Sequence, residues 1–169
     1  IVHEQLPKLP PNHVIGEPVM RDVGPAVGLA AALLARENPL EPMVILWSDH
    51  LVKKDALFRK ILLASGSIVT KEQDRIVFVA QKARFASENL GWINFGKETK
   101  NTDGVSFHSF VDFQYRPDAK TAKQYFESGH HAWNLGYFVT TPKFLLSLYE
   151  TFVPNVYKGI SQIAETWHT

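Results

Sequence analysis

The alternation of hydrophobic and polar positions predicts a chain in which helices and strands follow one another. Residues 26–36 are rich in helix formers and follow Pro25, which suits a first helical turn because its missing N–H has no partner to lose there. Apolar residues recur at helical spacing over 55–65. Further helices are expected over 119–128, ended by Gly129, over 142–152, and from Pro154 onward.

Short apolar or alternating runs between these helices predict strands. Residues 43–47 form a continuous apolar run between Pro42 and Ser48, which is typical of a strand buried on both faces of a parallel sheet. Residues 13–16, 75–80, 105–115 and 137–140 also have strand character. Because helices and strands alternate, we expect an α/β domain with a mainly parallel sheet.

The amino-acid composition limits the partners, the chemistry and the cellular location that can be expected for this chain. The chain has 169 residues, the size of one ordinary domain, and its 18 Lys and Arg nearly balance 17 Asp and Glu, so a nucleic-acid partner is not expected. There is no Cys, which excludes disulfides and thiolate chemistry and fits a reducing, cytoplasmic location. The longest apolar run, 26–35, is about half of the roughly 20 residues that span a bilayer, so no membrane association is expected.

Asp49 is the strongest single candidate for chemistry. It lies just past the carboxyl end of the strand expected at 43–47, where ligands bind in open α/β sheets, and a carboxylate there can hold Mg²⁺. The alternative is that Asp49 caps the next helix. The adjacent His130 and His131 point in different directions on a turn, so we expect an exposed loop there rather than a metal site.

Four motifs occur in an order that resembles the mannose-1-phosphate guanylyltransferase family. Residues 113–138, FQYRPDAKTAKQYFESGHHAWNLGYF, join a strand, a Pro turn, a helix and a WN-x-G turn, where the family has FVEKPD, a helix ending SG, and WNSGxF. Before it come EP-x-x-R-x-x-x-P at 17–25, SDH at 48–50 and E-x-x-G-aromatic-I at 88–93. The resemblance implies a three-layer, Rossmann-like nucleotidyltransferase domain with a mainly parallel mixed sheet.

Two parts of the family pattern are not found in these residues. The Gly-rich phosphate loop GGxGTRLxPxxxxxPK is absent, as is the W-x-D-x-G element that carries a second metal-binding Asp. We therefore expect residues 1–169 to be a single partial domain, incomplete at the N-terminus, with nucleotide-side elements over 1–75 and sugar-binding elements over 76–169. We expect such a chain to be weakly active or inactive alone, and an open sheet edge to favour a homo-oligomer.

The resemblance implies a role for each candidate residue. Asp49 corresponds to the catalytic metal ligand for Mg²⁺, and Arg116 stands where the family has a Lys that contacts the sugar phosphate. Glu88, Gly91 and Asn134 correspond to sugar contacts. If the glycines are matched strictly, Ser87 falls on the family's Glu and Glu88 on its Thr, so Gly91 is the safer assignment. The chain departs from the family at three further positions, where Trp47, Tyr115 and Leu135 replace Pro, Glu and Ser.

On the nucleotide side, Glu17, Pro18 and Arg21 match an element that lies along the nucleotide base in the family. The alternative is a plain helix start with Asp22 as the N-cap. The family's Asn-Thr-Ala is Asp-Val-Gly over 22–24 here, which weakens the inference for guanine, because bases are distinguished by buried polar groups that match their edges.

The implied reaction joins a sugar 1-phosphate to a nucleoside triphosphate. A phosphate oxygen of mannose 1-phosphate attacks the α-phosphate of GTP, pyrophosphate leaves and GDP-mannose forms, so no protein nucleophile is required. The alternative from another class is a non-catalytic relative that binds a nucleotide sugar and regulates a partner. A metal-dependent glycosyltransferase is less favoured, because Asp49 lacks the second carboxylate of a DxD pattern.

Overall fold

The computed structural model describes residues 2–17, 19 and 22–167, and begins with short helices. α1 (Val2–Gln5) and the 3-10 helix η1 (Pro11–His13) precede the long helix α2 (Val23–Glu37). The Asp22 carboxylate accepts a hydrogen bond of 2.7 Å from the Val23 backbone N–H, so Asp22 is the N-cap of α2. The strand expected over 13–16 is not formed.

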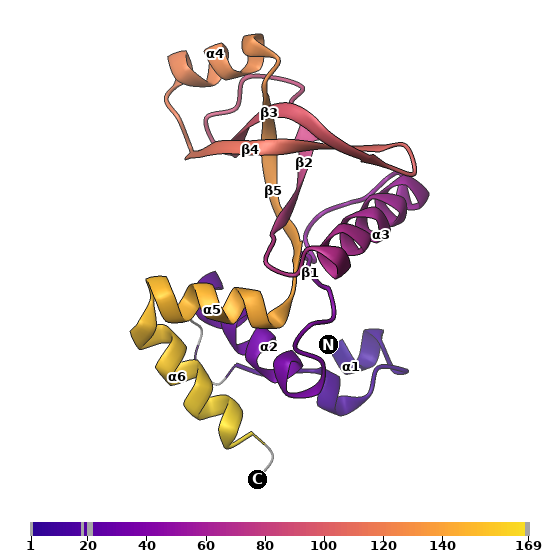
Figure 1. Ribbon diagram of the computed structural model, residues 1–169, viewed down its shortest axis with the longest axis vertical. Coiled ribbons are helices and arrows are strands. Elements are labelled where there is room, and N and C mark those ends of the chain that lie inside the picture. The colour runs from indigo at the N-terminus through magenta and orange to yellow at the C-terminus, as the bar shows by residue number, and fades with distance from the viewer. Residues whose placement is uncertain (1, 18, 20–21, 168–169) are drawn as a thin grey trace.

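Five strands form one sheet: β1 (Met43–Ile45), β2 (Val77–Lys82), β3 (Gly91–Thr102), β4 (Val105–Tyr115) and β5 (His131–Thr140). β2 lies along one edge of β5. β1 pairs with residues 138–140 of β5, and β3 pairs with residues 131–134 of β5. Because β2 already pairs with most of these β5 residues along one edge, β1 and β3 both lie along the opposite edge of β5. β4 pairs with β3 at the outside of the sheet. β5 is therefore the central strand (Figure 1).

The expected Rossmann-like, mainly parallel sheet is wrong, because every strand pair is antiparallel. An apolar run shows that a strand is buried but carries no information about the direction of its neighbour. β1 also departs from the expected burial on both faces. Met43 is buried, whereas the next side chain, Val44, is 39% exposed.

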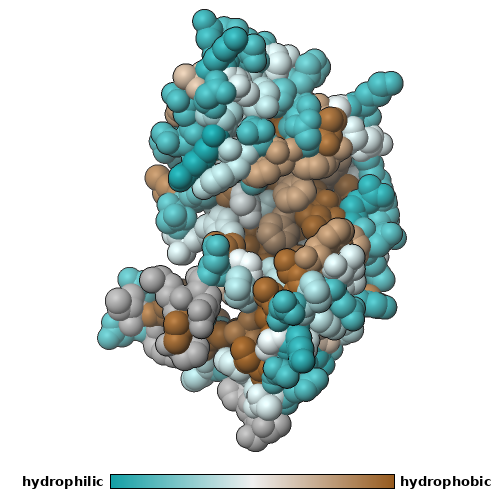
Figure 2. Space-filling view, turned by 90° about the vertical axis from the view of Figure 1, so that its left-hand side faces the viewer, coloured by the Kyte–Doolittle hydropathy of each residue, from teal (hydrophilic) through white to brown (hydrophobic). Residues whose placement is uncertain are grey.

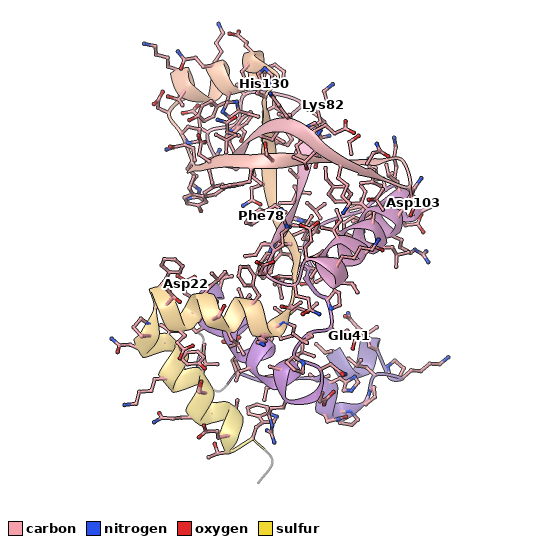
Figure 3. All side chains as sticks on the ribbon, viewed as in Figure 1. Asp22, Glu41, Phe78, Lys82, Asp103 and His130 are labelled. Atoms are coloured by element: carbon pink, nitrogen blue, oxygen red, sulfur yellow. The ribbon has the colours of Figure 1, made fainter. Side chains whose placement is uncertain are left out.

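A long hairpin formed by β3 and β4 extends from the sheet. Its turn, Asp103-Gly104, has positive φ at both residues (52° and 76°), which is the conformation of a two-residue type I′ turn. Asp103 marks the tip of the hairpin, which lies beside α3 (Asp55–Lys71) in Figure 3. A strand was expected over 105–115, where β4 forms, but none was expected over 91–102, where β3 lies.

The remaining helices pack at the two ends of the sheet (Figure 1). α5 (Pro142–Phe152) and α6 (Pro154–Glu165) pack with α2 at one end, around Ala32, Ile160 and Ala164. α4 (Ala119–Ser128) lies at the other end, where Tyr125 packs against the buried Trp92. No helix in the described part of the chain is both long and apolar enough to cross a membrane.

Candidate functional site

Three of the predicted sugar-side segments meet in one row across the sheet. Gly91 of β3 pairs with Tyr115 of β4 on one side and with Asn134 of β5 on the other. Arg116 directly follows Tyr115, and its backbone N–H donates to the Leu90 carbonyl over 3.3 Å. Residues that are far apart in the sequence are thus placed side by side by strand register.

Arg116 offers an exposed guanidinium at the end of this row. Its backbone has a φ of 45°, which is uncommon for a residue other than glycine, and the guanidinium carbon lies 5.1 Å from the centre of the Tyr115 ring. Among residues 2–17, 19 and 22–167, no carboxylate forms an ion pair with Arg116. The guanidinium is therefore available to bind a phosphate group through paired N–H donors.

The ring of Phe113 covers Gly91, a contact that the sequence analysis missed. A Cβ atom at Gly91 would lie 2.7 Å from this ring, closer than two carbon atoms can approach. Gly91 is needed for the packing of Phe113, whatever else it contacts. Phe113 is 44% exposed and Tyr115 is 61% exposed, so the surface beside Gly91 is aromatic. The contact between Phe113 and Gly91 depends on the register of β3 and β4, which cannot be read from the sequence.

Asn134 shapes the irregular part of β5 that follows it, where the pairing with β2 shifts register. Its side-chain oxygen accepts a hydrogen bond of 2.9 Å from the backbone N–H of Gly136, which has a φ of 75°. The indole of Trp47 lies directly against Gly136, where a side chain would stand in any other residue. Trp47 follows β1 and precedes Asp49 by two residues, so this contact brings the end of β1 next to the irregular part of β5 at Gly136.

Asp49 lies in the loop after β1, and 83% of its side chain is exposed. It is not the cap of the next helix, because the N-cap of α3 is Lys54. The neighbouring His50 places Nε2 4.0 Å from Asp49 Oδ1 and Nδ1 2.7 Å from the hydroxyl of Tyr137. Burial, and secondarily the negative charge of Asp49, raise the pKa of Tyr137 above its usual value.

The donor groups around Asp49 determine which kind of metal site this loop can form. The described residues contain no group of three or more His, Cys, Asp or Glu side chains that could hold a metal ion. Mg²⁺ is commonly bound by one or two carboxylates together with substrate phosphates and water. Asp49 fits that mode of binding, and does not fit a closed cage of protein ligands.

The other predicted residues are not part of this row of paired strand residues. Glu88 is exposed in the loop before β3, while the preceding Ser87 is buried and its carbonyl accepts a hydrogen bond of 2.8 Å from Trp92 Nε1. Glu17 is exposed in the segment before α2, and none of the described contacts links it to Gly91 or Asn134. Pro18 and Arg21 lie outside the described residues.

Of the two adjacent histidines, His130 lies in the exposed loop that was expected, and His131 does not. His131 is the first residue of β5, and its ring stacks on Tyr125 with 4.0 Å between the ring centres. Its Nδ1 lies 2.8 Å from Ser128 Oγ, at the end of α4. Burial lowers the pKa of His131, Asp112 acts in the opposite direction, and His130 adds to the lowering.

A cavity of about 1160 Å³ lies between α3, β2 and the β3–β4 hairpin, away from the predicted residues. None of the described site candidates lines it. At one end, Arg75 and Lys100 both pair with Glu72, at 2.6 and 3.5 Å. Its other walls are mainly apolar, and Figure 2 shows that hydrophobic surface crosses the middle of one face of the molecule.

Comparison with known proteins identifies relatives of this chain. No family model matches it. It is 27% identical over 98% of its length to mannose-1-phosphate guanylyltransferase 2 of Escherichia coli O157:H7, covering 36% of that protein. It is 32% identical over 93% of its length to the alginate biosynthesis protein AlgA of Pseudomonas fluorescens, covering 32% of that protein.

Two solved structures share the fold. One, described as mannose-1-phosphate geranyltransferase from Thermus thermophilus, matches 90% of this chain and 43% of its own, with a TM-score of 0.77 and 22% identity. The other, mannose-6-phosphate isomerase from Helicobacter pylori, matches 97% of this chain and 60% of its own, with a TM-score of 0.75 and 18% identity.

The chain is therefore homologous to one part of a class of enzymes, those of GDP-mannose biosynthesis. Within that class, its relatives are the mannose-1-phosphate guanylyltransferases and the AlgA proteins. The chain spans about a third of the length of the curated relatives it matches.

Proposed function

We propose that this chain provides the sugar-phosphate site of a mannose-1-phosphate guanylyltransferase, which makes GDP-mannose from mannose 1-phosphate and GTP. One observation supports this most: Gly91, from one motif of that family, lies side by side with Tyr115-Arg116 and Asn134, from the two ends of a second motif, across β4, β3 and β5. Motifs that matched by chance would have no reason to converge on one row of a sheet.

In this proposal the side chains bind and orient the two substrates. The Arg116 guanidinium holds the sugar phosphate, and Asn134 donates from its amide nitrogen to a sugar hydroxyl while its oxygen holds Gly136. Glu88 is placed in the loop that leads to Gly91, where its carboxylate can accept from sugar hydroxyls. The phosphate oxygen is already anionic, so alignment with the α-phosphate of GTP is the main requirement.

Asp49 is assigned to hold Mg²⁺ together with the phosphate oxygens of the substrates. The cation, when bound, neutralises negative charge that develops on the triphosphate as pyrophosphate leaves. Asp49 is exposed and has one carboxylate to offer, so the substrates themselves must supply further ligands. Cation binding at Asp49 is therefore expected to be weak without nucleotide.

The first test of this proposal measures binding of mannose 1-phosphate by calorimetry. Arg116→Ala is expected to weaken binding by about 10- to 100-fold, the typical value of a hydrogen bond to a charged group. Arg59→Ala is the matched control, because Arg59 is an exposed arginine on α3 paired with Asp55 at 2.9 Å. Equal losses in both variants, or none in either, would contradict the assignment of Arg116.

The second test measures pyrophosphate release with each sugar 1-phosphate and each nucleoside triphosphate, with and without Mg²⁺. Turnover that requires mannose 1-phosphate, GTP and Mg²⁺, and that disappears in Asp49→Asn, would support the full proposal. Asp103→Asn, at the hairpin tip, is the control for loss of one exposed carboxylate. Conversion of mannose 6-phosphate to fructose 6-phosphate is assayed in parallel, and its presence without pyrophosphate release would refute the guanylyltransferase assignment.

A non-catalytic sugar-nucleotide-binding protein is the second candidate, and one observation favours it. The ring of Tyr115 stands where the family has a sugar-binding carboxylate, and it is exposed beside the ring of Phe113. A surface of this kind can stack on a sugar ring without positioning it for attack. Binding of GDP-mannose without turnover of any substrate pair would support this candidate.

A further inference from the structure

Tyr137, His50 and Asp49 form a connected series that leads from the buried sheet to the exposed carboxylate. Tyr137 is 3% exposed on β5, where the centre of its ring lies 5.5 Å from that of Phe58 in α3 and 5.1 Å from that of His50, in a T-shaped arrangement. Its hydroxyl lies 2.7 Å from His50 Nδ1, and the opposite nitrogen of the same ring lies 4.0 Å from Asp49 Oδ1.

The direction of the first hydrogen bond follows from burial. Within the described part of the chain, His50 Nδ1 is the hydrogen-bond partner found for the Tyr137 hydroxyl, and the O–H of this buried phenol is satisfied only if that nitrogen accepts. If Nδ1 accepts, neutral His50 must carry its own proton on Nε2, the nitrogen that faces Asp49.

We propose that His50 is a positioning residue for Asp49: Tyr137 fixes its tautomer, so that the Nε2–H is directed at Oδ1 and Oδ2 is left to a divalent cation. This inference rests on the proposed function for the role of the cation, but the tautomer can be measured without it. At 4.0 Å the two atoms are outside hydrogen-bond distance, so the proposal requires the exposed Asp49 side chain to turn toward His50 for the bond to form.

The arrangement follows a general rule of metal sites. Side chains that bind a metal are usually held by a second hydrogen bond from the protein, and removing that partner typically lowers metal affinity by about 10- to 100-fold. An exposed Asp with no such partner would spend much of its time in other rotamers. The His50 ring, held by a buried phenol, restricts Asp49 while leaving it open to solvent.

The test uses the full chain and two readouts. Nitrogen-15 NMR of the histidine rings reports which nitrogen of His50 carries the proton. Wild type is expected to show the Nε2–H tautomer, and Tyr137→Phe, which keeps the ring packing, is expected to show a mixture of tautomers. A wild-type Nδ1–H tautomer, or an unchanged tautomer in Tyr137→Phe, would overturn the proposal even if the chain proves to be an active guanylyltransferase.

Mn²⁺ is the probe for the second readout, followed by electron paramagnetic resonance. His50→Gln keeps an N–H donor near the position of Nε2 and is expected to bind Mn²⁺ nearly as well as wild type. His50→Asn places its amide near Nδ1 and is expected to bind about tenfold more weakly, as is Tyr137→Phe. Equal affinity in the Gln and Asn variants, or a wild-type affinity that Asp49→Asn does not reduce, would refute the positioning role. Amide NMR spectra of each variant confirm that it is folded.

Discussion

Replacing Gly136 with Ala is expected to destabilise the protein through two separate effects. Gly136 has a φ of 75°, and a residue with a Cβ atom pays about 1–2 kcal/mol for that conformation. The added Cβ would also collide with Trp47 Nε1 and lie 3.2 Å from two further atoms of the indole ring. Trp47 would have to move away from β5.

The size of the effect follows from adding these contributions. Forcing an extra carbon into a packed contact typically costs about 1–3 kcal/mol, so the total is expected to be about 2–5 kcal/mol. Domains of this size are stable by about 5–15 kcal/mol, so the loss is a large fraction of the whole. In a thermal melt it corresponds to a fall in Tm on the order of 10 °C.

Urea denaturation followed by circular dichroism measures this loss directly, and Gly159→Ala is the matched control. Gly159 lies in α6 with no atom within 4 Å of its Cβ position, so this change is expected to stabilise the protein by about 0.5–1 kcal/mol. In a double-mutant cycle, Trp47→Ala should remove the packing part of the Gly136→Ala cost and leave the conformational part. A Gly136→Ala variant as stable as wild type would refute the reasoning.

Two further predictions concern stability. Thr141→Val should cost about 2–3 kcal/mol in urea denaturation, because its buried hydroxyl accepts from the Phe144 N–H at the start of α5 and donates to the Gln73 carbonyl. The exposed Thr151→Val is its control, and a similar loss there would contradict the capping role. Burial lowers the pKa of His131 from 6.5, so wild-type stability should be fully present above about pH 6.5 and fall as pH drops through the lowered value. His131→Asn should flatten this decline in thermal melts, and an unchanged pH dependence would contradict it.

Helix boundaries could be predicted because their signals are local. α4 ends at Gly129, which has a φ of 70°, and α5 begins at Pro142 after the Thr141 cap, as the sequence indicated. Both signals act within a few residues of the helix end. The first expected strand, over 13–16, failed because a short apolar run without alternation is weak evidence for a strand.

Strand direction and pairing could not be read from the sequence, because they depend on residues distant in the chain. The run at 43–47 suggested a parallel strand, yet its partner β5 runs antiparallel to it. β3 was not expected, although Asp103-Gly104 is a recognised signal for a two-residue hairpin turn. The same dependence on register hid the contact between Phe113 and Gly91. The motif matches selected Gly91, Asn134 and Arg116, which lie in or directly beside one row of the sheet. Their chemical roles stay predictions.

The central position of β5 has a consequence for how the chain folds as it is synthesised. β1 and β2 pair with no strand except β5 in the described sheet, and β5 comes last of the five. Until β5 leaves the ribosome, only the β3–β4 hairpin can form, while the apolar β1 and β2 segments remain without partners. Such long-range pairing is intrinsically slow and leaves strand edges open to aggregation. Nascent chains that stop short of β5 should therefore depend most on chaperones.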